Sequence, residues 1–171
     1  QLIWILPNAI SSVLLNYYQE TNKEHSVQLG LLYGSFSVYA TFIAAIVLSC
    51  LYYYVIPLIY GNQFEQVFDL CLILFAGTIP FTIAIIVANL NSGIGFIRIN
   101  LFATIFVFTI GIVLNIVLIP AYGLRGAAFG KLISYIAGTA FHLVVTGYLY
   151  KLPWWEFFKP TRLKDLLKAN I

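Results

Sequence analysis

The residues best suited to chemistry in this sequence are ionisable and amide side chains within long apolar stretches. Lys131 and His142 are eleven residues apart, close to a whole number of helical turns, so one helix would carry both on one face. Asn115 and Asn89 lie in the two preceding apolar stretches. Intramembrane ionisable groups usually face the protein interior or a wet cavity, so this pattern favours a ligand path. The alternatives are hydrogen-bonded packing and, for Lys131, a side chain that extends to the membrane surface.

The sequence lacks the groupings that catalysis or metal binding would require. No Asp or Glu lies in the central part of any apolar stretch. The segment from Gly126 to Lys131 is not a phosphate-binding loop, because three residues rather than four separate its glycines and Leu132 stands where Ser or Thr is needed. Cys50 and Cys71 have no metal-ligand spacing, and we interpret them as buried, inert thiols. We therefore expect no enzymatic activity, no cofactor and no metal.

The composition predicts the elements that position these residues. Of 171 residues, 61% are hydrophobic and 9% are charged, whereas soluble domains have roughly 45–50% apolar and about 25% charged residues. This excludes a soluble globular enzyme, and the net charge of +3 is too small for nucleic-acid binding. A bilayer core about 30 Å thick requires about 20 apolar helical residues per crossing. We predict an all-α, polytopic membrane protein with a transmembrane bundle over 1–150, whose five helices cover about residues 2–18, 30–57, 70–89, 100–119 and 127–150.

Four prolines lie within or beside these predicted helices. Proline supplies no backbone donor and disfavours helix at the preceding residue, so Pro57 and Pro120 are expected to end the second and fourth helices. Pro7 and Pro80 lie inside the first and third helices and are expected to kink them. The segment between Pro120 and Gly126 is then a short, stiff turn that joins the last two helices.

Polar residues gather on one face of each of the last three predicted helices. Such stripes indicate either hydrogen bonding between helices or a wet cavity. The stripes comprise Thr78, Thr82 and Asn89 in the third helix, Asn100, Thr104, Gly111 and Asn115 in the fourth, and Lys131, Ser134, Tyr135, Gly138, Thr139, His142 and Thr146 in the fifth.

Basic residues are distributed unequally between the two sides of the predicted bundle. Arg125 and Lys131 lie on one side. The other carries Lys23 and Arg98 in the loops and, in the tail over 151–171, the residues Lys151, Lys159, Arg162, Lys164 and Lys168. The positive-inside rule places this second side, and with it the carboxyl terminus, in the cytoplasm. The tail itself has apolar and basic residues at helical spacing, which is typical of an amphipathic segment on a membrane surface.

One segment resembles a known family of membrane transporters. The run from Asn115 to Ala128, NIVLIPAYGLRGAA, and the following LISY at 132–135 resemble the junction of the last two helices in Wzx-type polysaccharide flippases. These belong to the multidrug/oligosaccharidyl-lipid/polysaccharide superfamily. Weaker similarity extends over PLIYG at 57–61 and LPNAISSVL at 6–14. Two departures are the lack of a proline near the end of the first predicted helix and Lys131, where a small or hydroxyl residue is usual.

The resemblance implies twelve helices in two six-helix lobes, of which this chain forms most of the carboxyl-terminal lobe. Since the sequence contains no Met, we treat it as a fragment that lacks the amino-terminal lobe of the same protein. The implied activity is the flipping of polyprenyl-diphosphate-linked oligosaccharide across the inner (plasma) membrane for O-antigen or other surface polysaccharide. The implied partners are this substrate and membrane lipids, without nucleic acid. The candidate substrate-path residues are Lys131, His142, Asn115, Asn89, Arg98 and Lys23, the last two at the cytoplasmic mouth.

Three other functions are compatible with the sequence. One is the carboxyl-terminal lobe of a multidrug exporter of the same superfamily, whose ion site would lie in the other half. Another is a membrane enzyme acting on polyprenyl-linked sugars, which would need a reactive constellation that this sequence does not contain. The last is a purely structural membrane subunit.

Overall fold

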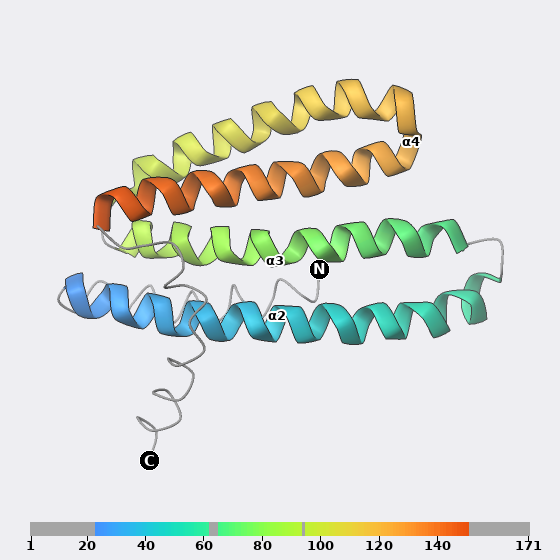
Figure 1. Cartoon of the computed structure of the whole chain (residues 1–171), viewed down its shortest axis with the longest axis horizontal. Helices are drawn as coiled ribbons and strands as arrows, with labels where there is room; N and C mark the ends of the chain where they lie inside the picture. Colours follow the sequence, from blue (N-terminus) through green and yellow to red (C-terminus); the bar gives the residue numbers. More distant parts are fainter. Residues whose placement is uncertain (1–22, 62–64, 94, 151–171) are drawn as a thin grey trace, which may run out of the picture.

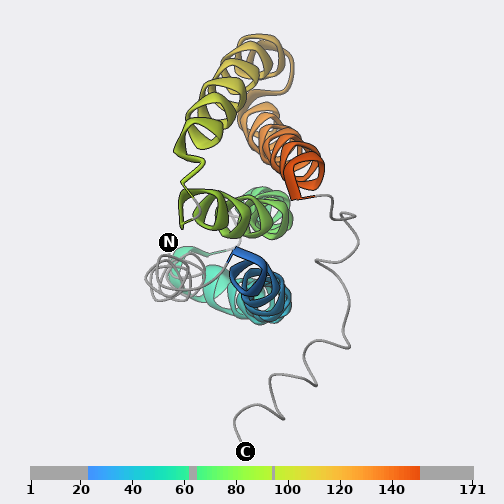
Figure 2. The ribbon, with the colours of Figure 1, turned by 90° about the vertical axis from the view of Figure 1, so that its left-hand side faces the viewer.

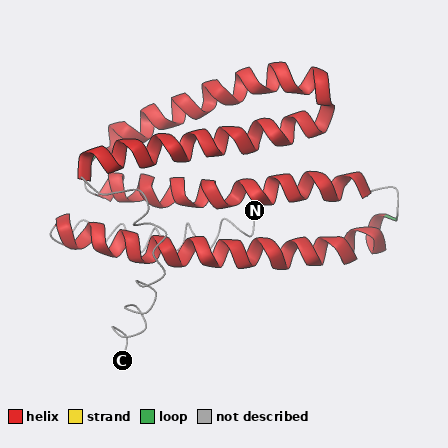
Figure 3. Ribbon diagram, viewed as in Figure 1, coloured by secondary structure: helices red, strands yellow, loops and turns green. Residues whose placement is uncertain are grey.

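The computed structural model describes residues 23–61, 65–93 and 95–150, and these form three helices. They are α2 (Lys23–Tyr60), α3 (Glu65–Gly93) and α4 (Ile97–Tyr150), with no strand among the described residues (Figures 1 and 3). Each contains a segment long and apolar enough to cross a membrane. The predicted all-α class is therefore confirmed for the described residues, and the apolar helices are compatible with the predicted membrane protein. The helix expected over 2–18, with Pro7, and the tail over 151–171 lie outside the described residues.

Helix α4 folds back on itself at Gly123. The backbone there has φ 58° and ψ −134°, a conformation that only glycine adopts without strain. Residues 97–122 form the first arm and residues 124–150 the second arm, and the two arms run antiparallel (Figure 1). The prediction that Pro120 ends the helix is wrong. Pro120 removes a single backbone donor, which the helix tolerates, whereas the reversal requires the positive φ of Gly123.

Glycines rather than prolines also end α2 and α3. Pro57 lies inside α2, so the expected end at this proline is wrong, and Gly61 at φ 76° donates its N–H to the Pro57 carbonyl at 3.0 Å. After α3, Gly95 at φ 95° donates to Ser92, and Phe96 donates to Asn91 at 2.7 Å. This is a Schellman cap. Each helix thus ends where a glycine with positive φ allows following backbone N–H groups to donate to the last helical carbonyls. As a result, the helices are several residues longer than predicted.

Helix α3 is the middle layer of the structure, with α2 on one side and α4 on the other (Figure 2). Its fully buried residues include Val87 and Leu90. On the α2 side, the hydroxyl groups of Thr41 and Thr82 are hydrogen-bonded, with 3.3 Å between their oxygen atoms. On the α4 side, the Thr139 hydroxyl donates to the Pro80 carbonyl at 2.5 Å. Pro80 lies inside α3, as predicted. Polar bonds as well as apolar contacts therefore fix α3 between its neighbours.

The helices alternate in direction, so the structure has two chemically different ends (Figure 1). One end, here called the Arg98 end, holds the starts of α2 and of the first arm and the end of the second arm. The opposite end, here called the Arg125 end, holds the start of α3 and the reversal at Gly123. There the Arg125 guanidinium lies 2.9 Å from the Asp69 carboxylate, and both side chains are more than half exposed. This ion pair joins α3 to the tip of α4.

The cysteines differ from the expectation of two buried thiols. Cys50 is exposed on α2 and Cys71 is partly buried on α3, and both are free. Cys50 lies on the face of α2 that also exposes Val47, Tyr54 and Leu58. Since a thiol is a weakly polar group, this outward position is compatible with an apolar surface.

Candidate functional site: a cavity inside the α3 and α4 layers

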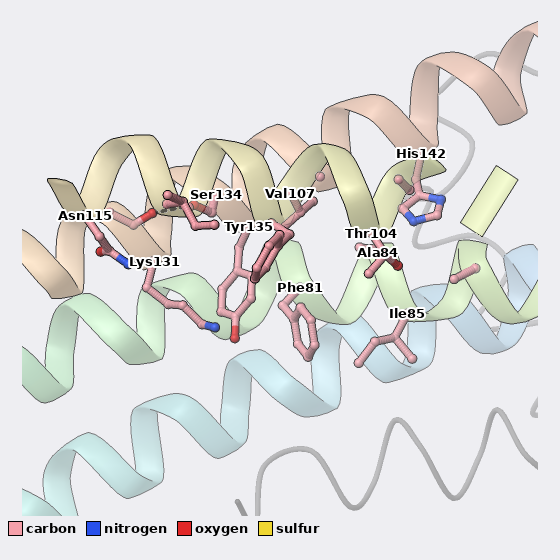
Figure 4. Close-up of a pocket in the computed structure, with 17 residues that line it drawn as sticks. Phe81, Ala84, Ile85, Thr104, Val107, Asn115, Lys131, Ser134, Tyr135 and His142 are labelled. Atoms are coloured by element: carbon pink, nitrogen blue, oxygen red, sulfur yellow. Dashed lines mark hydrogen bonds between the residues drawn. The ribbon is translucent and has the colours of Figure 1, made fainter. Parts of the chain in front are cut away.

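A cavity of about 600 Å³ lies between α3 and the two arms of α4. This volume is within the range of roughly 300–1,000 Å³ that is typical of small-molecule sites. Its wall is mainly apolar, with polar groups at intervals. The residues that line it are Phe81, Ala84, Ile85 and Ala88 on α3, Ala103, Thr104, Val107, Phe108, Gly111, Ile112 and Asn115 on the first arm, and Gly130, Lys131, Ser134, Tyr135, Gly138 and His142 on the second arm (Figure 4).

Glycines on the second arm keep its polar residues close to the first arm. A Cβ atom at Gly130 would lie 2.9 Å from Asn115 Oδ1, and one at Gly138 would lie 2.5 Å from Val107. Nearer the reversal, a Cβ at Gly126 would overlap the Leu118 carbonyl. Gly126 and Gly130 therefore allow the two arms to pack closely, because a larger residue at either position would force the arms apart.

A cation and an amide lie at one end of the cavity, where Figure 4 shows Lys131 near Asn115. The Lys131 ammonium lies 4.8 Å from the centre of the Tyr135 ring, a cation–π distance. The Tyr135 ring lies 4.4 Å from that of Phe81, between ring centres. Lys131 itself is exposed, and within the described parts of the chain no carboxylate pairs with it. At this end of the cavity, the Lys131 ammonium is therefore a positive charge without a carboxylate partner among the described residues, and it lies over the Tyr135 ring.

His142 marks the opposite end of the cavity, near Thr104 in Figure 4. The histidine is 7% exposed, and its Nδ1 atom has no hydrogen-bond partner among the described residues. An unpaired buried polar group costs roughly 1–3 kcal/mol. Within the described residues, the Nδ1 atom of His142 is thus available to a ligand in the cavity.

The structure divides the predicted polar stripes into packing residues and cavity residues. On the second arm, Thr139 bonds to α3 as described above, and Thr146 accepts a bond from the buried Asn91 at 3.2 Å. On α3, Thr78 and Thr82 are buried and donate to carbonyls of their own helix. Hydrogen bonding between helices therefore accounts for Thr139 and Thr146, whereas Lys131, Ser134 and His142 line the cavity.

The predicted site residues accordingly have different positions. Lys131, His142 and Asn115 line one cavity. Asn89 is half-buried on α3 but does not line the cavity. Arg98 is exposed near the start of α4, at the end where Lys23 begins α2. The starts of α2 and α4 share an end of the structure, and Arg98 does not line the cavity.

Sequence reasoning missed the wall that α3 contributes. Phe81, Ala84, Ile85 and Ala88 recur at helical spacing, but so do other apolar residues of α3, and no sequence signal separates those that pack from those that line a cavity. The pairing of Asp69 with Arg125 was also missed. It could have been found, because the predicted topology places both residues at the same membrane surface.

The lining of the cavity is suited to binding a ligand. It combines a cation, an amide, hydroxyl groups and an imidazole with aromatic and aliphatic surface. Within residues 23–61, 65–93 and 95–150, no cluster of three His, Cys, Asp or Glu side chains could hold a metal ion. No protein-family model, curated protein or solved structure matches this chain.

Proposed function

We propose that this chain is part of a membrane transporter that moves polyprenyl-diphosphate-linked oligosaccharide across the cytoplasmic membrane for assembly of surface polysaccharide. The observation that carries this proposal is the cavity, because Lys131, Asn115 and His142 project into one space between apolar helices. A diphosphate requires cations and hydrogen-bond donors, and sugar hydroxyls require neutral polar partners. The resemblance of the Asn115 to Ala128 run to flippases adds to this argument.

The proposed topology has five crossings, with the Arg98 end in the cytoplasm. The two arms of α4 each exceed the roughly 20 residues that a crossing needs, and α2 and α3 supply one crossing each. The region expected to form a helix over 2–18 supplies the fifth. The support for this orientation is the excess of Lys and Arg in the tail and at the Arg98 end over those at the Arg125 end.

The proposed mechanism needs a lobe that moves without changing shape. Alternating access in transporters is largely the rocking of one rigid bundle against another. The abrupt reversal at Gly123 and the contact of Gly126 with the Leu118 backbone support such rigidity, since the arms are linked without a loop. The Asp69–Arg125 pair supports it further by holding α3 to the same unit.

The positive charge in the cavity argues against the multidrug alternative for cationic drugs. A cationic compound near Lys131 would experience like-charge repulsion, which costs affinity. An anionic lipid-linked substrate would be attracted at the same position. We therefore retain the oligosaccharide transporter as the proposed function.

The test is polysaccharide export by the full-length protein at matched membrane abundance. Lys131→Gln and His142→Ala are expected to reduce export, whereas Lys131→Arg retains the charge and should preserve most of it. Val144→Ala changes a residue that is 71% exposed on the same arm and outside the cavity, so it serves as the control. Normal export by both Lys131→Gln and His142→Ala would refute the proposed substrate path.

A further inference from the structure

Exposed tyrosines lie on both outer layers of the structure toward the Arg125 end. Tyr53 and Tyr54 are 60% and 74% exposed on α2, and Tyr122 is 66% exposed on the first arm of α4. Helix α3 lies between these two layers (Figure 2). None of the three tyrosines lines the cavity, so the proposed function leaves them without a role.

Two contacts place these tyrosines at the same level along the bundle. The ring centre of Tyr53 lies 5.5 Å from that of Phe68 on α3. Asp69, the next residue of α3, is paired with Arg125 at 2.9 Å. Tyr122 belongs to the same tip of α4 as Arg125, on the other side of the reversal. The ring contact and the ion pair therefore connect α2 through α3 to the tip of α4 at one level.

This level lies at the edge of the hydrocarbon if the helices cross a membrane. The side chains of Asp69 and Arg125 are more than half exposed, and charged groups are costly within a bilayer core. About two turns closer to the bilayer centre, the exposed side chains are aliphatic, such as Val47 on α2 and Ile116 on the first arm. The surface thus changes from aliphatic groups to tyrosine and charge over a short distance. Tyrosine is enriched at such a boundary, because its ring is apolar and its hydroxyl is polar.

The distance to the opposite boundary fits a single bilayer. Tyr148 is 86% exposed and follows Arg125 by 23 residues on the second arm, which is about 35 Å along a helix. A bilayer has a hydrocarbon core about 30 Å thick and measures about 40–45 Å with its headgroup layers. The levels of Arg125 and Tyr148 can therefore lie in the two headgroup layers at the same time.

We infer that Tyr53, Tyr54 and Tyr122 form a tyrosine belt that holds the Arg125 end in the headgroup layer of a lipid bilayer. Their rings contact the upper part of the acyl chains, and their hydroxyls donate to ester or phosphate oxygens of the lipids. Helix α2 continues for seven residues beyond Tyr53, about 10 Å, and extends past the tip of α4 (Figure 1). The inference rests on the membrane crossings of the proposed function, but not on transport of an oligosaccharide.

Spin labelling can measure the depth of the tyrosine belt in the full-length protein, reconstituted in phosphatidylcholine vesicles. Depth is obtained from collisions of the label with oxygen, which concentrates in hydrocarbon, and with a water-soluble nickel complex. In a cysteine-free background, the labelled variants are Tyr54→Cys and Tyr122→Cys in the belt, and Val47→Cys and Ile116→Cys as controls. We expect equal depths at 54 and 122. From the helical rise, position 47 should be about 10 Å deeper than 54, and position 116 about 9 Å deeper than 122.

A double substitution tests whether the tyrosines set this depth. Tyr54→Leu with Tyr122→Leu should move a label at position 116 toward the bilayer centre. The matched control is Phe36→Leu with Phe42→Leu, which changes two exposed aromatic residues within the apolar part of α2 and should leave the depth unchanged.

Four results would overturn the inference. They are unequal depths at 54 and 122, depths there equal to those at 47 and 116, protection of 54 and 122 from both probes, and an unchanged depth in the tyrosine double variant. Protection from both probes would show that protein rather than lipid covers the tyrosines. Free access of the nickel complex to all four positions would also refute the membrane crossings. Polysaccharide export is measured separately, so a failure of the proposed transport is distinguishable from a failure of the tyrosine belt.

Discussion

Replacing His142 by Leu should increase the free energy of unfolding of the protein. The imidazole is 7% exposed, and its Nδ1 atom has no hydrogen-bond partner among the described residues. Leu removes this unpaired group, whose burial costs roughly 1–3 kcal/mol. Some of the gain is lost to imperfect packing of the new side chain, which leaves about 1–2 kcal/mol. For a chain of this size, 1 kcal/mol changes the melting temperature by roughly 2–4 °C, so an increase of about 2–8 °C is expected.

The assay is thermal unfolding of the purified protein in detergent, with Thr139→Val as the matched control. Thr139 lies one turn earlier on the same arm and donates to the Pro80 carbonyl, so removing its hydroxyl should lower the melting temperature. The two substitutions both replace a buried polar side chain by an aliphatic one, and they differ in whether the polar group is bonded. A decrease in melting temperature for His142→Leu equal to that for Thr139→Val would refute the reasoning, because it would mean that the imidazole makes a stabilising bond.

Three further predictions follow from the packing and the topology. Gly126→Ala should destabilise the protein by about 1–3 kcal/mol and so lower the yield of monodisperse protein, because the added Cβ overlaps the backbone of the first arm; normal yield would contradict that contact. Thr146→Val should destabilise by about 0.6 kcal/mol through loss of its bond with Asn91, and a double-mutant cycle with Asn91→Leu should recover this value; zero coupling would contradict the bond. In a cysteine-free background, a membrane-impermeant thiol reagent added to intact cells should label Tyr122→Cys and spare Ile97→Cys, and the reverse pattern would invert the proposed topology.

The sequence predicts the helices well because their main determinant is local. Long uncharged stretches can satisfy their backbone only as helices in a membrane, so helix existence follows from composition. Helix ends depend instead on which residue accepts positive φ, and sequence reasoning placed the ends at Pro57 and Pro120 when Gly61 and Gly123 determine them. Proline was given too much weight, because a single missing donor does not stop a helix whose remaining bonds are intact.

The candidate site was predictable in part, for a different reason. Lys131 and His142 share a face by helical periodicity alone, which needs no knowledge of neighbouring helices. Whether a polar residue faces a cavity or another helix depends on the angle between arms, and this angle is set by the close contacts of Gly130 and Gly138. Thr139 and His142 are adjacent on the second arm, yet one bonds to α3 and the other lines the cavity. Sequence periodicity cannot separate two residues that lie so close on one face.

The loop-free reversal at Gly123 has a consequence for how the chain enters a membrane. Since the two arms are joined without a polar loop, the segment that must be moved across the bilayer is little more than the tip of the hairpin, and the charge there is that of Arg125. A lone arginine at the bilayer centre costs about 2.5–3.5 kcal/mol on the insertion scale, a cost that two apolar arms can offset. The arms of α4 are therefore suited to insert together as a single hairpin. The pairing of Arg125 with Asp69 would then form only after the crossing, and it would oppose withdrawal of the tip from the surface that it has reached.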